Sequence, residues 1–268
     1  MKPALKIVKL TDIVPLMEAD SAKVEYLKRI IKSTGTIRHP LALAALPGNK
    51  FILLEDASVL EAIHSLRINY IPAQVIKCRD TLKFNAGLTA GKVVLSDVRL
   101  FSDMFPRALH TADKEISGFC DAARVRINRK DDAGVIVYFF RNKAGQLPPA
   151  LFTFLKYLRG HWSFCSGLMP GRIRAFNVKC GTDNWLLSID DLSIKDILYA
   201  AQNELLFPPG LLKFNFGNRI IGIEYPVDVL NENVPVGQKE QFLHDLVNLR
   251  LNSGFSDFIK NGVYLLNY

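Results

Sequence analysis

Residues 41–54 read LALAALPGNKFILL. Two apolar runs, residues 41–46 and 51–54, flank the turn-forming segment Pro-Gly-Asn-Lys, and this arrangement predicts a β-hairpin. The patterns on either side of the hairpin extend the prediction to a complete domain.

The residues before the hairpin predict a strand and a helix. Residues 5–10 alternate apolar and basic side chains, which is typical of a short, half-exposed strand. From Ser21 onward the apolar residues follow helical spacing, with Ser21 as the expected N-cap and Gly35 at the position where helices commonly end. These apolar residues are Val24, Leu27, Ile30 and Ile31.

The residues after the hairpin predict a second helix and a closing strand. Residues 58–66 form the helix, and residues 71–76, IPAQVI, form the strand. Pro72 suits an edge strand or a first strand position, because proline donates no hydrogen bond to a sheet. Residues 5–77 therefore read β-α-β-β-α-β, a compact α+β domain.

The remainder predicts a second α+β domain, so that the chain divides into residues 1–78 and 79–268. We expect helices over 96–104, 147–158, 193–206 and 239–251, and strands over 135–140, 173–178, 185–189 and 263–266. Residues 214–225 predict a strand pair or one bent strand. Ser193 is the expected N-cap of the third of these helices. The last helix is amphipathic, and the residues expected to face inward are Phe242, Leu243, Leu246, Val247 and Leu249.

The composition is that of a globular protein. The chain has 268 residues, of which 49% are apolar and 22% charged, so disorder and fibrous designs are excluded. A net charge of +8 suits a polyanionic partner such as nucleic acid or a nucleotide, or alternatively marks a protein with a basic surface. Neither an apolar leader nor a run of about 18 apolar residues occurs, so we expect a cytoplasmic protein.

Several common sites are absent from the sequence. The cysteines form no C-x-x-C pair and have no histidine at metal-ligand spacing, so we expect reduced, buried thiols and no zinc site. No Walker, G-x-G-x-x-G, G-x-S-x-G or protein-kinase motif occurs, and nucleotide chemistry would therefore need a less common fold. The cysteines are Cys78, Cys120, Cys165 and Cys180.

Three segments of the first domain resemble the ParB/sulfiredoxin superfamily, and within it the free L-serine kinases, including the branch that makes O-phosphoserine for siderophore precursors. These segments are 10–15 (LTDIVP), 37–43 (IRHPLAL) and 71–76. Two later segments, 206–210 (LFPPG) and 217–226 (GNRIIGIEYP), are similar to the same family. The resemblance implies a ParB/sulfiredoxin-like N-terminal domain with a C-terminal α+β domain closing over it.

The resemblance also implies roles for residues of the first domain. Glu18 matches the family's catalytic base, a carboxylate that accepts the proton of the substrate hydroxyl as the phosphoryl group arrives. The alternative is a solvated loop carboxylate beside Asp20. Arg38 and His39 match the family's Ile-Arg-His-Pro turn and would orient the phosphates of a nucleotide, or would alternatively be a surface pair.

The phosphate-binding motif departs from the family. Where relatives carry Asp-Gly-x-His/Asn-Arg at the start of the second helix, this chain has residues 55–59, EDASV. Glu55 keeps the acid, but Val59 replaces the arginine that clamps phosphates, and Asp56 adds negative charge where an anion should sit. Ser58 is left to cap the helix and donate to a phosphate.

The second signature is also altered. The family's Thr-Arg-His becomes residues 212–214, LKF, in which Lys213 keeps a cation without the planar fork of arginine. Arg219 matches the family's Gly-Arg position and would hold the carboxylate of an amino acid together with Lys213. Its alternative is a strand-surface arginine.

Three functions follow as hypotheses. The first is phosphoryl transfer from ATP or ADP, with Mg²⁺, to free L-serine or a similar hydroxyl substrate. The second is a catalytically inactive relative that acts as a regulatory or binding protein, because the phosphate motif is altered. The third is DNA binding, suggested by a basic segment and by the DNA-associated ParB-like relatives. The basic residues are Arg124, Arg126, Arg129 and Lys130, with Arg141 and Lys143 nearby.

Overall fold

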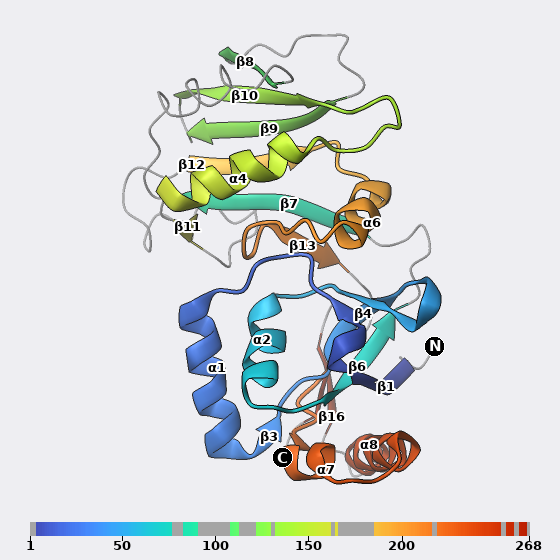
Figure 1. Ribbon diagram of the computed structural model, residues 1–268. Helices are drawn as coiled ribbons and strands as arrows, with labels where there is room; N and C mark the ends of the chain where they lie inside the picture. The colour runs from blue at the N-terminus through green and yellow to red at the C-terminus, as the bar shows by residue number, and fades with distance from the viewer. Residues whose placement is uncertain are drawn as a thin grey trace. The chain divides into compact units, whose positions relative to one another are not determined.

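A computed structural model describes most of the chain as two compact units (Figure 1). The described residues are 4–76, 83–90, 108–112, 122–129, 132–161, 164–165, 185–215, 219–252, 256–259 and 263–266. The first unit joins residues 1–83 with 214–268, and the second comprises residues 84–213. The prediction assigned residues 214–268 to a C-terminal domain, whereas here they belong with the N-terminal residues.

The first unit contains a five-stranded sheet in the order β1-β6-β4-β5-β2. Its strands are β1 (Ala4–Lys9), β2 (Ile13–Val14), β4 (Leu41–Ala45), β5 (Phe51–Leu53) and β6 (Tyr70–Ile76). β4 and β5 pair antiparallel with Leu43 opposite Leu53, which confirms the predicted hairpin.

The prediction of an edge position for Pro72 is wrong, because β6 lies between β1 and β4. Pro72 stands opposite Ile7 in the antiparallel pair with β1. The interior placement follows from the apolar faces on both sides of β6, where Ile71 and Ala73 are fully buried. The sheet therefore tolerates one residue without an N–H donor in an internal strand.

Two helices, α1 (Ser21–Thr34) and α2 (Ala57–Ser65), lie side by side (Figure 1). The predicted cap of α1 is off by one residue, because Asp20 accepts hydrogen bonds from the N–H groups of Ala22 and Lys23. Gly35 ends the helix with a left-handed φ of 66°, as predicted. Asp56, and not Ser58, caps α2.

The C-terminal residues complete the first unit. They form β14 (Arg219–Ile221), β15 (Tyr225–Pro226), α7 (Val227–Asn231), α8 (Val236–Asn252), β16 (Ser256–Ile259) and β17 (Val263–Leu266). β15 pairs with the short strand β3 (Thr36–Ile37), placing Tyr225 opposite Ile37. β14 runs parallel to β17, and α8 packs against β1.

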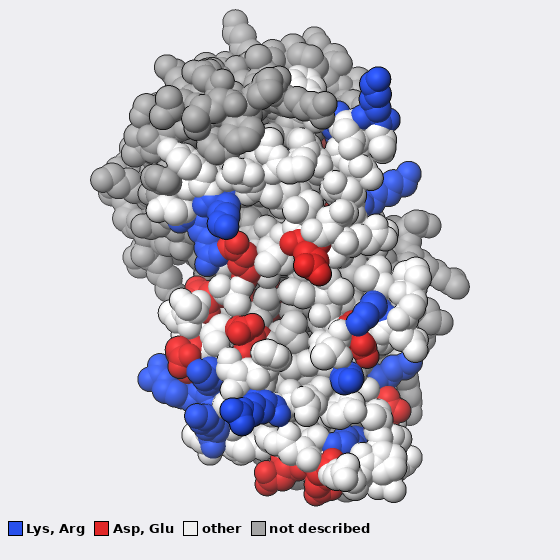
Figure 2. All heavy atoms as spheres, in the orientation of Figure 1, with Lys and Arg blue, Asp and Glu red and all other residues white. Residues whose placement is uncertain are grey.

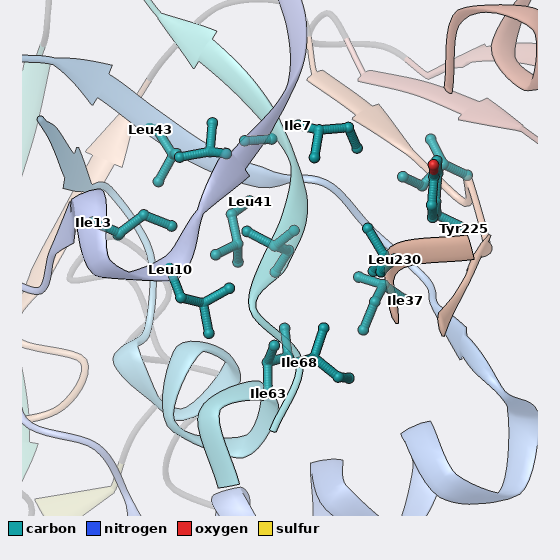
Figure 3. Close-up of a cluster of buried hydrophobic side chains, with 14 of the residues drawn as sticks. Ile7, Leu10, Ile13, Ile37, Leu41, Leu43, Ile63, Ile68, Tyr225 and Leu230 are labelled. Carbon is teal, nitrogen blue, oxygen red and sulfur yellow. The ribbon is translucent and has the colours of Figure 1, made fainter. Parts of the chain in front are cut away.

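One apolar core joins the sheet, both helices and the C-terminal residues. Figure 3 shows Leu230 of α7 beside Ile37, near Tyr225, with Leu41 and Ile63 from the N-terminal part in the same cluster. Each fully buried branched side chain contributes about 1.5–3 kcal/mol relative to exposure. Burial of this shared surface is the reason that residues far apart in the sequence form a single unit.

The inward face predicted for α8 is partly wrong. Leu243 and Val247 are buried, but Phe242 is 38% exposed and Leu249 is 68% exposed. The third buried position is Lys239, whose ammonium donates to the carbonyls of α7 residues and the loop after it. Positions spaced by four residues lie on one helix face, so the buried stripe runs through 239, 243 and 247.

The second unit is built on a seven-stranded sheet. Six of its strands follow the order β11-β7-β12-β9-β10-β8, and β13 pairs with β7. Its strands are β7 (Lys83–Ala90), β8 (Ala108–Ala112), β9 (Ala122–Arg129), β10 (Asp132–Phe140), β11 (Phe164–Cys165), β12 (Trp185–Asp190) and β13 (Leu212–Asn215). The predicted strands over 135–140 and 185–189 are confirmed by β10 and β12.

Two helices accompany this sheet, α4 (Pro149–His161) and α6 (Ile194–Gln202). Phe154 of α4 contacts Phe139 of β10, and their ring centres lie 5.3 Å apart. Figure 1 shows α4 in front of the middle of this sheet. Ser193 caps α6 as predicted, in a reciprocal capping box with Asp196. The predicted helix over 96–104 and the predicted strand over 173–178 fall outside the described residues.

Candidate functional site

A pocket of about 290 Å³ lies in the first unit, between the facing surfaces of α1, β3 and α2. Four apolar side chains of α1 and Val59 of α2 form much of its wall, and four ionisable side chains and Thr36 line it from other elements. The α1 residues are Tyr26, Leu27, Ile30 and Ile31. The ionisable residues are Arg38, His39, Glu55 and Arg219.

His39 enters the pocket from the short connection between β3 and β4. Its ring nitrogen Nδ1 accepts a hydrogen bond of 2.9 Å from the N–H of Gly222, so the proton of the neutral ring is on Nε2. Burial lowers the pKa of His39 to about 4, and the positive charges of Arg38 and Arg219 act in the same direction. His39 is therefore a neutral donor at pH 7.

The segment that carries Gly222 is fixed to the sheet. The N–H of Ile220 donates to Oε1 of Gln74 at 3.0 Å, and Gln74 is 3% exposed in β6. Arg250 of α8 donates to the carbonyl of Gly222, and the N–H of Glu224 donates to the carbonyl of Arg38 at 3.2 Å. These bonds hold β14, and with it Arg219, against the pocket.

Arg219 and Glu55 form an ion pair inside the pocket wall. The side chain of Glu55 is 15% exposed and that of Arg219 is 28% exposed. Oε1 of Glu55 is the atom that pairs with Nη2 of Arg219, and within the described structure this buried oxygen accepts no hydrogen bond. Burial raises the pKa of Glu55 to about 7, although the charge of Arg219 and the N–H of Ala42 oppose the rise.

The N-terminus of α2 is already occupied by a carboxylate. Asp56 accepts hydrogen bonds from the N–H of Ser58 and from the ammonium of Lys23, both at 2.7 Å. Burial acts to raise the pKa of Asp56, but these bonds outweigh it and hold the pKa below its usual value. The position where an anion would meet the helix dipole is therefore filled by the chain itself.

The structure brings four of the seven predicted site residues together. Arg38, His39, Glu55 and Arg219 line the pocket, whereas Glu18, Ser58 and Lys213 are not among its lining residues. Glu18 is half-buried just before α1. Lys213 is half-buried on β13, where burial lowers its pKa, and it belongs to the second unit.

Ser58 is placed differently from the prediction. It does not cap α2, and its side chain has no exposed surface. Its hydroxyl accepts a hydrogen bond of 2.9 Å from the N–H of Asp20, which joins the starts of the two helices. A hydroxyl committed in this way leaves no surface for a ligand.

Sequence reasoning missed the apolar wall and the residues that support the pocket. Leu27, Ile30 and Ile31 were assigned to a helix without a ligand, although their spacing was the signal for a shared face. Gln74 carried no signal beyond being a polar residue in an apolar strand. Such a residue indicates a buried partner but does not identify it.

Two arginines of the basic segment, Arg124 and Arg126, are paired with acidic residues. Nε of Arg124 lies 2.5 Å from Oδ2 of Asp191, and Arg126 pairs with Asp190 on the neighbouring strand β12. On the face drawn in Figure 2, the coloured basic and acidic side chains are interspersed. The side chain of Arg129 and residue Lys130 fall outside the described part. The paired arginines do not favour DNA binding, because their charge is neutralised locally.

Among the described residues, no three His, Cys, Asp or Glu side chains gather closely enough to hold a metal ion. None of their helices combines the length and apolar character needed to cross a bilayer.

Comparison with solved structures identifies the architecture. The fold matches SbnI with a C-terminal truncation from Staphylococcus aureus at 18% identity and a TM-score of 0.69, covering 91% of this chain and 96% of that one. It matches a free serine kinase in complex with AMP at 11% identity and a TM-score of 0.61, covering 86% of this chain and 95% of that one. A conserved hypothetical protein from Pyrococcus furiosus matches at 11% identity and a TM-score of 0.59, covering 86% and 98%.

No protein-family model and no curated protein sequence matches the chain. The likeness therefore rests on structure, and at these identities it concerns the fold. It extends over most of the chain in each case, so it includes both units. The protein has the α+β fold that is found in SbnI and in the free serine kinases.

Proposed function

We propose that this protein is a nucleotide-dependent small-molecule kinase, which transfers a phosphoryl group from ATP or ADP to the hydroxyl of free L-serine or a similar substrate. The observation that carries the proposal is the fold shared with a free serine kinase in complex with AMP over 86% of this chain. A further match to a free serine kinase in complex with ADP has a TM-score of 0.60.

The chain offers a group for each role that the reaction requires. Glu18, just before α1, is the proposed base that accepts the hydroxyl proton. Arg38 is an exposed cation beside the neutral donor His39, and together they are proposed to orient anionic groups of the nucleotide. Arg219 is proposed to hold the substrate carboxylate. Mg²⁺ enters the proposal with the nucleotide, whose phosphates supply several of its ligands.

The test begins with binding. Calorimetric titration of the full chain with ATP and with ADP, each with Mg²⁺ and with or without L-serine, should give micromolar binding that serine strengthens. Phosphorus NMR should then detect O-phosphoserine with the native chain and at least about 100-fold less with Glu18→Gln. Glu61→Gln, an exposed glutamate of α2, is the matched control and should keep full activity. Equal activity of the two variants would refute the role of Glu18.

A second candidate function is a non-catalytic relative that binds ligands or partners. It is favoured by Asp56, whose carboxylate occupies the N-terminus of α2 where the resemblance implies a phosphate. The double variant Asp56→Gly with Val59→Arg restores the motif of the relatives. If this variant binds ATP or ADP and the native chain does not, the non-catalytic candidate is supported. Turnover by the native chain would refute it.

A further inference from the structure

We propose that the pocket between α1 and α2 binds a free α-amino acid with an apolar side chain, with Glu55 as partner of the ligand ammonium and Arg219 as partner of its carboxylate. The inference goes beyond phosphoryl transfer, because it requires neither a nucleotide nor Glu18. It rests on the charges, the wall and the size of the pocket.

The charges of the pocket mirror those of a zwitterion. Glu55 and Arg219 both line the cavity and lie against each other there. An α-amino acid carries an ammonium and a carboxylate on one carbon, so it can insert beside this ion pair with its ammonium against Glu55 and its carboxylate against Arg219. Charge-assisted hydrogen bonds of this kind are the stronger ones, and arginine binds a carboxylate with two parallel donors.

The buried oxygen of Glu55 supports this assignment. Oε1 lies in the wall without a hydrogen bond from any residue that the structure describes. Buried polar atoms in native proteins are normally satisfied, and a site that leaves one open points to a ligand donor. A ligand ammonium has three N–H donors and can supply it.

When no nucleotide is bound, His39 offers a second contact for the carboxylate. Its Nδ1 is committed to the N–H of Gly222, so Nε2 carries the proton and can donate. His39 lines the same cavity as Arg219, and the network through Gly222 and Arg250 fixes the ring. A carboxylate between Arg219 and His39 would have donors on both oxygens.

The remaining wall selects the side chain of the ligand. Leu27, Ile30, Ile31, Ile37, Leu41 and Val59 surround the cavity with aliphatic groups, and Tyr26 adds an aromatic ring that is 55% exposed. Serine would leave these groups uncovered. Because each buried methylene strengthens binding about fourfold, leucine should bind at least roughly tenfold tighter than serine.

The size of the pocket limits the ligand. Its volume of about 290 Å³ lies at the lower end of the range for drug-sized ligands. This space suits a single amino acid and is too small to enclose an entire nucleoside di- or triphosphate. The neighbouring N-terminus of α2 adds no phosphate site, because Asp56 fills it.

The test is calorimetric titration of the full chain, without nucleotide and at pH 8, where the carboxyl of Glu55 is mostly ionised, with L-leucine, L-serine, 4-methylpentanoate and isopentylamine. The last two compounds lack the ammonium and the carboxylate, respectively. We expect L-leucine to bind, and each of the other three to bind at least roughly tenfold more weakly. If an analogue with one charge binds as well as L-leucine, or if L-leucine does not bind at millimolar concentration, the proposal is overturned.

Variants locate the site. Glu55→Gln should weaken the binding of L-leucine at least roughly tenfold, whereas the control Glu61→Gln should leave it unchanged. Val59→Asn changes the apolar wall and not the ion pair. It should weaken the binding of L-leucine and leave the binding of L-serine nearly unchanged. If Glu55→Gln does not fold, the comparison of the four ligands and the Val59→Asn variant still test whether the pocket binds an apolar amino acid. Loss of O-phosphoserine formation in the kinase assay would leave this result unaffected, and absence of leucine binding would leave the kinase proposal standing.

Discussion

The buried carboxyl of Glu55 should make the stability of the first unit depend on pH in an unusual direction. Its pKa is about 7 in the folded chain, mainly because of burial, and 4.5 in its ordinary environment. Between these values the folded state holds a proton that the unfolded state has released. The free energy of unfolding should therefore fall as the pH rises from about 4.5 to about 8.

The magnitude follows from the two pKa values. Their difference of about 2.5, at 1.36 kcal/mol for each unit of pKa, corresponds to a loss of about 3 kcal/mol from the stability at acidic pH. The side chain is only 15% exposed, so solvent screens this effect little. Glu55→Gln removes the titration and keeps the shape of the side chain.

Urea unfolding of the native chain and of Glu55→Gln, at several pH values from 4.5 to 8, measures the effect as a difference. The difference is needed because His39, whose pKa is lowered to about 4, contributes stability that rises with pH in an overlapping range and cancels between the two proteins. From pH 4.5 to pH 8, we expect the free energy of unfolding of Glu55→Gln, relative to that of the native chain, to increase by about 3 kcal/mol. A constant difference, or one of opposite sign, would refute the assignment of Glu55 as a buried carboxyl.

The remaining predictions concern stability and binding elsewhere. Lys239→Met leaves the carbonyls of Leu230 and Glu232 without their buried donor and should cost about 2 kcal/mol in urea unfolding; an unchanged midpoint would contradict its role. Asp56→Ala removes the N-cap of α2 and should cost about 1 kcal/mol, whereas Asp56→Asn should restore most of it in the same assay. Leu43→Ala opens a cavity at a fully buried strand position and should cost about 2–5 kcal/mol, and a loss below 1 kcal/mol would argue against this core. Arg124→Gln should leave the binding of duplex DNA at low salt unchanged, and a clear loss of affinity would revive the nucleic-acid hypothesis.

The sequence alone predicted the elements whose signals are local. The hairpin over residues 41–54 could be predicted because its two apolar runs and the proline-glycine turn between them are consecutive in the sequence. The caps Gly35, at the end of α1, and Ser193, at the start of α6, could be predicted because a helix cap depends on the residues next to it in the sequence. The order β-α-β-β-α-β of the longer elements, and with it the α+β class, followed from the same kind of pattern, whereas the two-residue strands β2 and β3 were not predicted.

The sequence pattern predicted the wrong N-cap where two nearby polar residues could both cap the same helix. Ser21 and Asp20 are both good N-caps, as are Ser58 and Asp56, and in each pair the aspartate caps the helix. The sequence left the hydroxyl of Ser58 available to bind a phosphate, because its contacts in the fold could not be predicted. In the fold it meets the N–H of Asp20, and that contact is set by the packing of α1 against α2.

The site itself was determined by contacts between distant residues. Arg219 reaches Glu55 only because Ile220 is bound to Gln74 and Tyr225 pairs with Ile37, which place the C-terminal residues in the first unit. The residue types of the pocket were visible in the sequence, but their partners were not. Periodicity and turn chemistry report on neighbours along the chain, whereas the ion pair, the neutral histidine and the apolar wall arise from burial of a core shared by segments more than 100 residues apart.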